Sequence, residues 1–172
     1  MNTPANTPAD PRAAIRLLVL DVDGTLTDGK IYIGPEGESM KAFDIKDGYA
    51  IAQLLPKGGI LPAVITGRKS RIVEQRCAEL GIRHLYQGVM DKPAAFARLL
   101  VAAGEELGQP LSGQNAAYMG DDLVDLPCMR LCAVRGCPAD AVEAVRAECQ
   151  FVSRKNGGAG AAREFIEWLL AR

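Results

Sequence analysis

Short apolar runs that stop abruptly at a polar residue or a glycine are the main pattern along the chain. Three such runs are Ile15–Leu20, Ile60–Ile65 and Ala116–Met119. A run of this length without polar alternation is typical of a strand buried on both faces, as in a parallel sheet. The three runs therefore predict neighbouring strands of one parallel sheet.

Helical periodicity follows each of these runs. In Lys69–Leu80 the apolar residues fall on one helical face, and Gly81 is suited to end the helix. Further helices are predicted over Lys92–Ala103, Asp122–Leu131 and Ala161–Leu170. Strands that alternate with helices indicate an α/β fold, a doubly wound parallel sheet, formed here by one domain over residues 15–172.

One segment interrupts the alternation. Lys30–Gly34, a turn at Pro35–Gly37 and Ser39–Asp44 predict a β-hairpin over residues 30–44, inserted after the first strand. The hairpin must either fold over the carboxyl edge of the sheet or pair with another subunit. In open α/β sheets ligands bind at that edge.

Composition and charge narrow the function classes. The 172 residues carry 20 Lys and Arg against 21 Asp and Glu, a net charge of −1. No basic field is present to hold nucleic acid or anionic lipid, and the longest apolar runs are too short to span a bilayer. Residues 1–14 lack a signal pattern and are predicted to be a disordered tail. We therefore expect a cytoplasmic protein without nucleic-acid or membrane partners.

The five cysteines are an odd number without the spacing of a disulfide framework. Cys128, Cys132 and Cys137 suggest a zinc cluster, but their spacing is not the usual paired one, and the single histidine, His84, lies far away. We interpret these cysteines as small buried hydrophobic residues.

Two acidic clusters begin at predicted strand ends. Asp21 and Asp23 are two residues apart, so their side chains point the same way, and Gly24 allows a tight turn. In the second cluster, Asp121 and Asp125 are predicted to share one face of a helix. That cluster alone also fits a helix with an acidic first turn. Together the clusters favour a bound divalent cation, which compensates carboxylate repulsion.

Groups suited to a phosphoryl ligand lie between the clusters. Thr66 and Arg68 follow one predicted strand, and Lys92 begins a predicted helix. A hydroxyl, helix N-terminal amides and an ammonium group bind phosphoryl oxygens and neutralise their charge.

With these motifs in this order, the sequence resembles the haloacid dehalogenase (HAD) superfamily of aspartate-nucleophile phosphohydrolases over about residues 15–170. Within the superfamily it is most similar to the capless branch that includes the 3-deoxy-D-manno-octulosonate 8-phosphate (Kdo 8-phosphate) phosphatases of lipopolysaccharide precursor synthesis. Stretches that match this branch include Leu26–Gly29, Lys41–Phe43, Asp47–Tyr49 and Tyr86–Gly88.

The resemblance implies a mechanism. Asp21 would attack phosphorus to form an aspartyl-phosphate, and Asp23 would protonate the leaving alcohol and then activate water. Thr66 and Lys92 would hold the phosphoryl oxygens. Mg²⁺ would bind the Asp21 carboxylate, the Asp23 backbone carbonyl and Asp121. Asp122 and Asp125 would support this metal site without binding the ion.

The resemblance also implies a homotetramer, joined in part by the hairpin. The substrate would be a small phosphorylated sugar acid. It would contact Asp23 and Lys92 and also Asp44, Lys46, Asp47, Gly48, Arg68, Arg76 and Arg163. The glycine-rich segment Gly157–Gly160, with Arg163, would close a neighbour's site. For Arg76 and for the glycines, a solvated surface charge and a flexible loop are the alternatives.

Three positions depart from the usual pattern of that branch: Asp44, Lys46 and Ala52. They leave two candidate substrates, Kdo 8-phosphate and another sugar-acid phosphate such as a nine-carbon sialic-type 9-phosphate. Two other classes are weighed as well. A response-regulator receiver domain is disfavoured, because such domains lack the late acidic cluster. A non-catalytic regulatory subunit is not favoured either, because every catalytic position is filled in this sequence.

Overall fold

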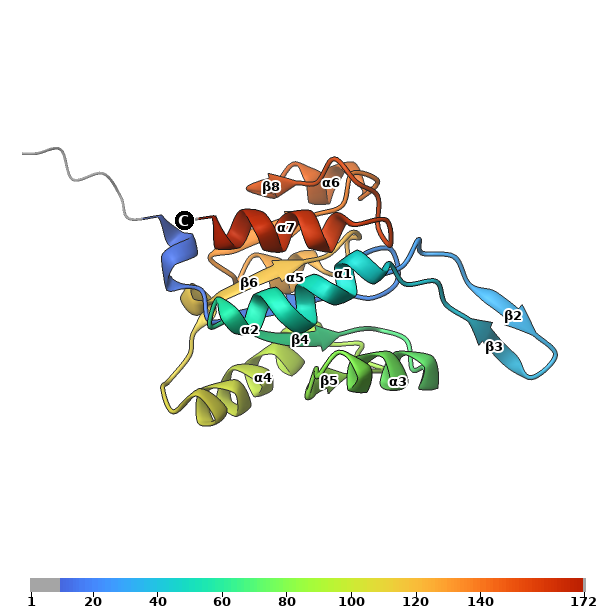
Figure 1. Cartoon of the computed structure of the whole chain (residues 1–172), viewed down its shortest axis with the longest axis horizontal. Helices are drawn as coiled ribbons and strands as arrows, with labels where there is room; N and C mark the ends of the chain where they lie inside the picture. Colours follow the sequence, from blue (N-terminus) through green and yellow to red (C-terminus); the bar gives the residue numbers. More distant parts are fainter. Residues whose placement is uncertain (1–9, 172) are drawn as a thin grey trace, which may run out of the picture.

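The computed structural model describes residues 10–171, and a six-stranded parallel sheet forms its centre (Figure 1). The strand order is β5-β4-β1-β6-β7-β8. The strands are β1 (Leu17–Leu20), β4 (Leu61–Ile65), β5 (His84–Tyr86), β6 (Ala116–Met119), β7 (Val134–Cys137) and β8 (Phe151–Val152). The doubly wound α/β sheet predicted from the apolar runs is confirmed.

The register of the three central strands positions the site. Leu20, the last residue of β1, pairs with Val64 of β4 on one side and with Met119 of β6 on the other. The three strands therefore end nearly level, and the polar residues that follow them reach the same edge of the sheet.

Helical segments cover both faces of the sheet (Figure 1). They are η1 (Pro11–Ala14), α1 (Ile45–Tyr49), η2 (Ala50–Leu54), α2 (Leu55–Lys57), α3 (Arg71–Glu79), α4 (Lys92–Leu107), η3 (Gly113–Asn115), α5 (Leu126–Met129), α6 (Glu143–Arg146) and α7 (Ala161–Leu170). Because side chains alternate along a strand, Leu18 and Leu20 of β1 pack with α7 and the segments η2 and α2, while Leu17 and Val19 pack with α4 and α5.

The helix predicted over Asp122–Leu131 is shorter in the structure. Only Leu126–Met129 is α-helical, and the preceding residues form a turn. Pro127 lies in the first turn of α5, a position that tolerates its missing N–H group. Asp125 therefore comes directly before the helix, and the prediction that Asp121 and Asp125 share one helical face is wrong.

Residues 1–9 of the expected N-terminal tail lie outside the described residues. From Asp10 onward the chain is held against α7. The Asp10 side chain accepts a hydrogen bond from the Arg12 backbone N–H at 2.9 Å. The Arg12 guanidinium lies 4.6 Å from the centre of the Trp168 ring and donates to the Trp168 carbonyl at 2.8 Å. This part of the segment expected to be disordered is therefore ordered.

The hairpin forms a separate two-stranded antiparallel sheet of β2 (Tyr32–Gly34) and β3 (Gly37–Met40). It extends from the body beyond the carboxyl edge of the main sheet (Figure 1). Large apolar side chains lie on its surface, with Ile33 76% exposed and Met40 56% exposed.

The cysteines Cys128, Cys132 and Cys137 lie in the core layer between the sheet and α4, as small buried hydrophobic residues. Across residues 10–171, no helix has both the length and the apolar character needed to cross a membrane.

Candidate active site

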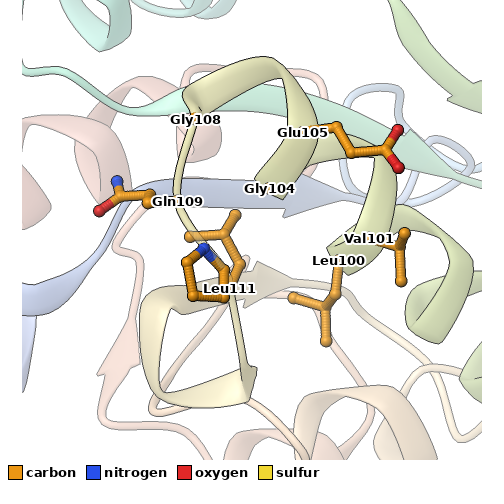
Figure 2. A pocket seen from close by; sticks show the side chains of 8 residues that line it. Leu100, Val101, Gly104, Glu105, Gly108, Gln109 and Leu111 are labelled. Atoms are coloured by element: carbon orange, nitrogen blue, oxygen red, sulfur yellow. The ribbon is translucent and has the colours of Figure 1, made fainter.

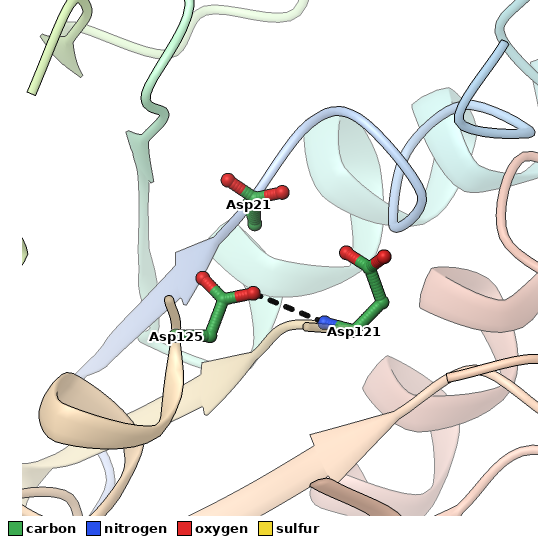
Figure 3. A group of neighbouring side chains, drawn as sticks. All are labelled: Asp21, Asp121 and Asp125. Carbon is green, nitrogen blue, oxygen red and sulfur yellow. Dashed lines mark hydrogen bonds between the residues drawn. The ribbon is translucent and has the colours of Figure 1, made fainter. Parts of the chain in front are cut away.

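Three carboxylates meet at the carboxyl edge of the sheet. Asp21 follows β1, Asp121 follows β6, and Asp125 precedes α5; one oxygen atom from each lies within 4.8 Å of the others (Figure 3). Asp21 and Asp125 are buried. Closely packed carboxylate oxygens are the ligands that Mg²⁺ and Ca²⁺ prefer.

Two glycines make room for this cluster. Gly24 has a φ of +94°, and a Cβ atom there would lie 2.1 Å from Asp121 Oδ2. At Gly120, a Cβ atom would lie 2.5 Å from the Asp125 carboxyl carbon. The glycine of each acidic motif is therefore required for the close approach of a carboxylate, as well as for the turn at Gly24.

Asp125 is fully engaged by the protein. Its Oδ1 accepts hydrogen bonds from Lys92 Nζ at 2.7 Å and from the buried Tyr118 hydroxyl at 2.9 Å. Its Oδ2 accepts from the backbone N–H groups of Asp121 at 3.1 Å and Asp122 at 3.3 Å. Asp125 therefore orients the loop that carries Asp121 and leaves Asp21 and Asp121 as the carboxylates available to a cation.

Lys92 approaches from the first turn of α4, where the Asp91 side chain caps the helix by accepting from the Ala94 N–H. Its ammonium group is buried and lies 2.7 Å from Asp21 Oδ1, the same distance as from Asp125 Oδ1. Burial favours the neutral amine, but the two carboxylates outweigh it and raise the pKa of Lys92. Lys92 therefore stays charged and fixes the orientation of Asp21.

The cluster holds more negative charge than Lys92 balances. Burial, together with the nearby Asp125 carboxylate, raises the pKa of Asp21 to about 8. Burial and Asp125 likewise raise the pKa of Asp121 to about 7. Ionisation of both carboxylates is therefore unfavourable near neutral pH, and a divalent cation between them would stabilise the ionised forms. Asp21 and Asp121 fit a site for such an ion.

The other predicted catalytic residues lie around the cluster. The Asp23 side chain is held by Lys41 Nζ, and its Oδ2 lies 3.8 Å from Arg68 Nε. Thr25 donates to Asp121 Oδ1 at 3.1 Å. Thr66 is buried directly after β4.

Three predicted substrate contacts have other partners for their side chains in the structure, and a fourth, Lys46, is exposed. Asp44 caps α1 by accepting from the Lys46 backbone N–H at 2.6 Å, and Lys46 is exposed. Asp47 is buried and accepts from the backbone N–H groups of Arg163 at 2.7 Å and Gly160 at 3.3 Å. Its carboxylate therefore caps the start of α7. The Arg163 guanidinium bonds Glu167 at 2.6 Å.

Arg76 lies against α1 and is neither a solvated surface charge nor part of the carboxylate cluster. A Cβ atom on Gly48 would clash with its guanidinium, which lies over the Phe43 ring at 5.6 Å and pairs with Glu79 at 2.9 Å. Its Nε is buried without a hydrogen-bond partner among the described residues. Gly48 is therefore needed for packing.

The glycine-rich segment before α7 packs on its own chain. A Cβ atom on Gly157 would lie 1.9 Å from the Gly24 carbonyl oxygen, and the Gly158 N–H donates to the Thr25 carbonyl at 3.1 Å. The segment supports the loop that carries the first acidic motif. Its closure of a neighbour's site stays a prediction.

Two hollows lie away from the carboxylates. Ala52 is one of the positions that depart from the usual pattern of the octulosonate phosphatases, and it was expected near the substrate. It lines a hollow of about 320 Å³ beside Leu61, at the amino-terminal end of β4. Ala52 is therefore remote from the candidate site. The other, about 450 Å³, lies between the end of α4 and the following loop, and its lining is mainly apolar (Figure 2).

Sequence reasoning missed the residues that surround Asp23. Lys41, Glu38 and Ser70 form a connected polar group there, and Tyr118 supports Asp125 from within β6. Lys41 stood in a motif shared with the octulosonate phosphatases, which was the available signal, but nothing in the local pattern connects it to Asp23.

The fold and this site define the class of protein. No protein-family model matches the chain. A solved structure from Legionella pneumophila, assigned to the hydrolases of HAD-superfamily subfamily III A, superimposes with a TM-score of 0.84 at 35% identity, covering 93% of this chain and 84% of that chain. The chain has the HAD fold without a separate cap domain, and the receiver-domain alternative is excluded.

The relatives narrow the class to one family. The chain is 48% identical to the Kdo 8-phosphate phosphatase KdsC of Escherichia coli K12 over 156 residues, 91% of this chain and 79% of that protein. The Kdo 8-phosphate phosphatase of Moraxella catarrhalis, solved with magnesium, phosphate and Kdo, superimposes with a TM-score of 0.82 at 40% identity, covering 93% of this chain and 88% of that chain. The chain belongs to the Kdo 8-phosphate phosphatase family.

Proposed function

We propose that this protein is a Mg²⁺-dependent phosphomonoesterase that hydrolyses Kdo 8-phosphate through an aspartyl-phosphate on Asp21. The observation that carries the proposal is the buried pair Asp21 and Lys92 beside Asp121, at the carboxyl edge of the sheet. The relative from Moraxella catarrhalis binds magnesium, phosphate and Kdo, which are the cofactor and the two products of this reaction.

The chain's own residues account for each bond that changes. An Asp21 oxygen attacks phosphorus while the ester P–O bond breaks, and Asp23 gives its proton to the leaving sugar oxygen. The Asp23 carboxylate then takes a proton from water, whose oxygen attacks phosphorus and releases Asp21 and inorganic phosphate. Mg²⁺ held by Asp21, Asp121 and the Asp23 backbone carbonyl supplies the positive charge that lets two anionic groups approach.

Lys92 and Thr66 hold the transferred phosphoryl group in this proposal. Lys92 already lies 2.7 Å from Asp21 Oδ1, so its remaining donor lies beside the attacked phosphorus. Thr66 ends β4 next to β1 and offers a hydroxyl at the same edge. Fixed donors in a buried site stabilise the charge that develops on the phosphoryl oxygens.

For the sugar acid, Arg68 is the cationic side chain that lies near Asp23 and remains 44% exposed. A guanidinium suits the substrate carboxylate because it presents paired donors. A nine-carbon sialic-type 9-phosphate carries the same carboxylate and phosphate and is the second candidate substrate.

Phosphate release tests the proposal and separates its alternatives. A panel of Kdo 8-phosphate, a sialic-type 9-phosphate, hexose phosphates and p-nitrophenyl phosphate is assayed with Mg²⁺ and with EDTA. We expect kcat/KM of about 10⁴ M⁻¹ s⁻¹ or more on Kdo 8-phosphate, in the ordinary range for enzymes. Preference for the nine-carbon ester would change the substrate, and no turnover on any ester would favour a regulatory subunit.

We also propose that the protein is a homotetramer in which the hairpin forms part of the interface. Its support is the exposed apolar surface of the hairpin, which includes Ile31, Ile33 and Met40. Light scattering should give about four times the chain mass, and Ile33→Asp should lower it because a charge would be buried in the interface. A monomer at micromolar concentration would contradict this assembly.

A further inference from the structure

A buried lysine with no role in the mechanism proposed above contacts Asp23, the proposed general acid. Lys41 directly follows β3, and only 1% of its side chain is exposed. Its Nζ donates to Asp23 Oδ1 and lies 2.9 Å from Glu38 Oε1. A buried ammonium group is costly unless it is paired, so both carboxylates are needed to hold it.

Glu38 connects this lysine to the body of the protein. Its Oε2 accepts a hydrogen bond from the Ser70 hydroxyl, and its Oε1 lies 3.6 Å from the Arg68 guanidinium. Ser70 is itself fixed, because it caps α3 by accepting from the Val73 N–H at 3.4 Å. The end of the hairpin is therefore tied to α3 through Glu38 and to the loop after β1 through Lys41.

We propose that Lys41, held by Glu38, is a positioning residue that selects which oxygen of Asp23 exchanges the proton during hydrolysis. An ammonium group has donors and no acceptor, so the oxygen that it contacts, Oδ1, must accept. A proton on Oδ1 would leave only a weakly accepting hydroxyl oxygen beside the ammonium group, which favours the proton on Oδ2. Proton exchange is thereby assigned to Oδ2. Arg68 Nε lies 3.8 Å from Oδ2, beyond hydrogen-bonding distance.

This inference rests on the proposed phosphatase reaction, and it predicts a dependence on the leaving group. A poor leaving group, such as a sugar alkoxide, needs the proton from Asp23 as the P–O bond breaks. A p-nitrophenolate leaves without protonation. Loss of the correct Asp23 orientation should therefore slow the first kind of ester far more than the second.

The experiment measures kcat/KM with Mg²⁺ for a series of aryl phosphates of increasing phenol pKa, together with Kdo 8-phosphate. Lys41→Met removes the ammonium group and keeps most of the side-chain length. Lys30→Met is the matched control, because Lys30 lies near the same hairpin but is exposed and pairs only with Asp28 among the described residues. Melting temperatures and circular dichroism establish that each variant is folded.

We expect Lys41→Met to lower kcat/KM about 30-fold or more for the poorest leaving groups and less than about 3-fold for p-nitrophenyl phosphate, so that the leaving-group slope steepens. Lys30→Met should keep the original slope. Glu38→Gln should steepen the slope in the same direction, because Glu38 holds Lys41 in place. This variant replaces Lys41→Met in the experiment if Lys41→Met does not fold.

Equal losses on all esters, or no loss on any, would overturn the positioning role of Lys41. Failure of the proposed function gives a different result. If the unmodified protein hydrolyses aryl phosphates but not Kdo 8-phosphate, only the substrate assignment fails, and the slope still tests Lys41. If it hydrolyses no ester, the phosphatase reaction and the role of Lys41 in it both fail.

Discussion

Replacement of Gly24 by alanine is a sharp test of the proposed cation site, because its effect is set by two measurable features. The new Cβ would lie 2.1 Å from Asp121 Oδ2, so the carboxylate must retreat by roughly 1.3 Å or more to reach an ordinary contact distance. The retreat breaks the 3.1 Å hydrogen bond from Thr25, worth about 1 kcal/mol. The φ of +94° costs an L-residue a further 1–2 kcal/mol or so.

The sum, about 2–3 kcal/mol, corresponds to a fall in melting temperature of roughly 5–10 °C for a domain of this size. Displacing one cation ligand should raise the Mg²⁺ concentration for half-maximal phosphate release by about tenfold or more. Gly108→Ala is the matched control. Gly108 ends α4 with a φ of +66°, and a Cβ there meets nothing within 4 Å.

The control variant should lose stability through its backbone alone and keep the original Mg²⁺ dependence. The assay is phosphate release titrated with MgCl₂, with melting curves recorded on the same samples. If Gly24→Ala lost stability but retained the Mg²⁺ dependence of the unmodified chain, Asp121 would not be a ligand, and the assignment of the cation to Asp21 and Asp121 would be refuted.

Three further predictions concern the surrounding carboxylates. Asp125→Ala should destabilise the fold by about 3 kcal/mol or more in urea unfolding, since it leaves the buried Tyr118 hydroxyl and two part-buried backbone N–H groups without their acceptors; a loss below about 1 kcal/mol would contradict this. Mg²⁺ should raise the melting temperature more at pH 8 than at pH 5.5, because the raised pKa values of Asp21 and Asp121, about 8 and about 7, leave them protonated in acid; equal shifts at both pH values would count against it. Burial raises the pKa of Asp47 to about 6, so its contribution to folding is present below about pH 4 and is lost as the pH rises through 6. Asp47→Asn should remove that part of the pH dependence of melting, and an unchanged profile would show that Asp47 does not titrate there.

Most of the fold follows from local sequence pattern. The strands β1, β4 and β6 are apolar throughout because both their faces are buried, so their positions could be predicted within about two residues. The short strand β8 has only two residues and no such signal. The helix before β4 contains Pro56 and a wide π-helical turn, which weaken its periodicity.

The meeting of two carboxylates at the carboxyl edge of the sheet was predictable for a related reason. Asp21 follows β1 directly and Asp121 follows β6 after Gly120, and these buried strands end level in the sheet, so sequence position alone brings the two carboxylates together. Lys41 and Glu38 were not predictable, because they reach Asp23 and Ser70 only through the path of the hairpin in space. The partners of Asp47 were not predictable for the same reason, since the backbone N–H groups of Gly160 and Arg163 lie more than 110 residues later.

The most direct test of the central claim compares the unmodified protein with Asp21→Asn in phosphate release from Kdo 8-phosphate at saturating Mg²⁺. The account predicts kcat/KM of about 10⁴ M⁻¹ s⁻¹ or more for the unmodified chain, and a loss of at least about 10³-fold in the variant, with the melting temperature and assembly retained. Substantial turnover by Asp21→Asn would contradict the covalent mechanism and with it the role assigned to the buried carboxylate pair.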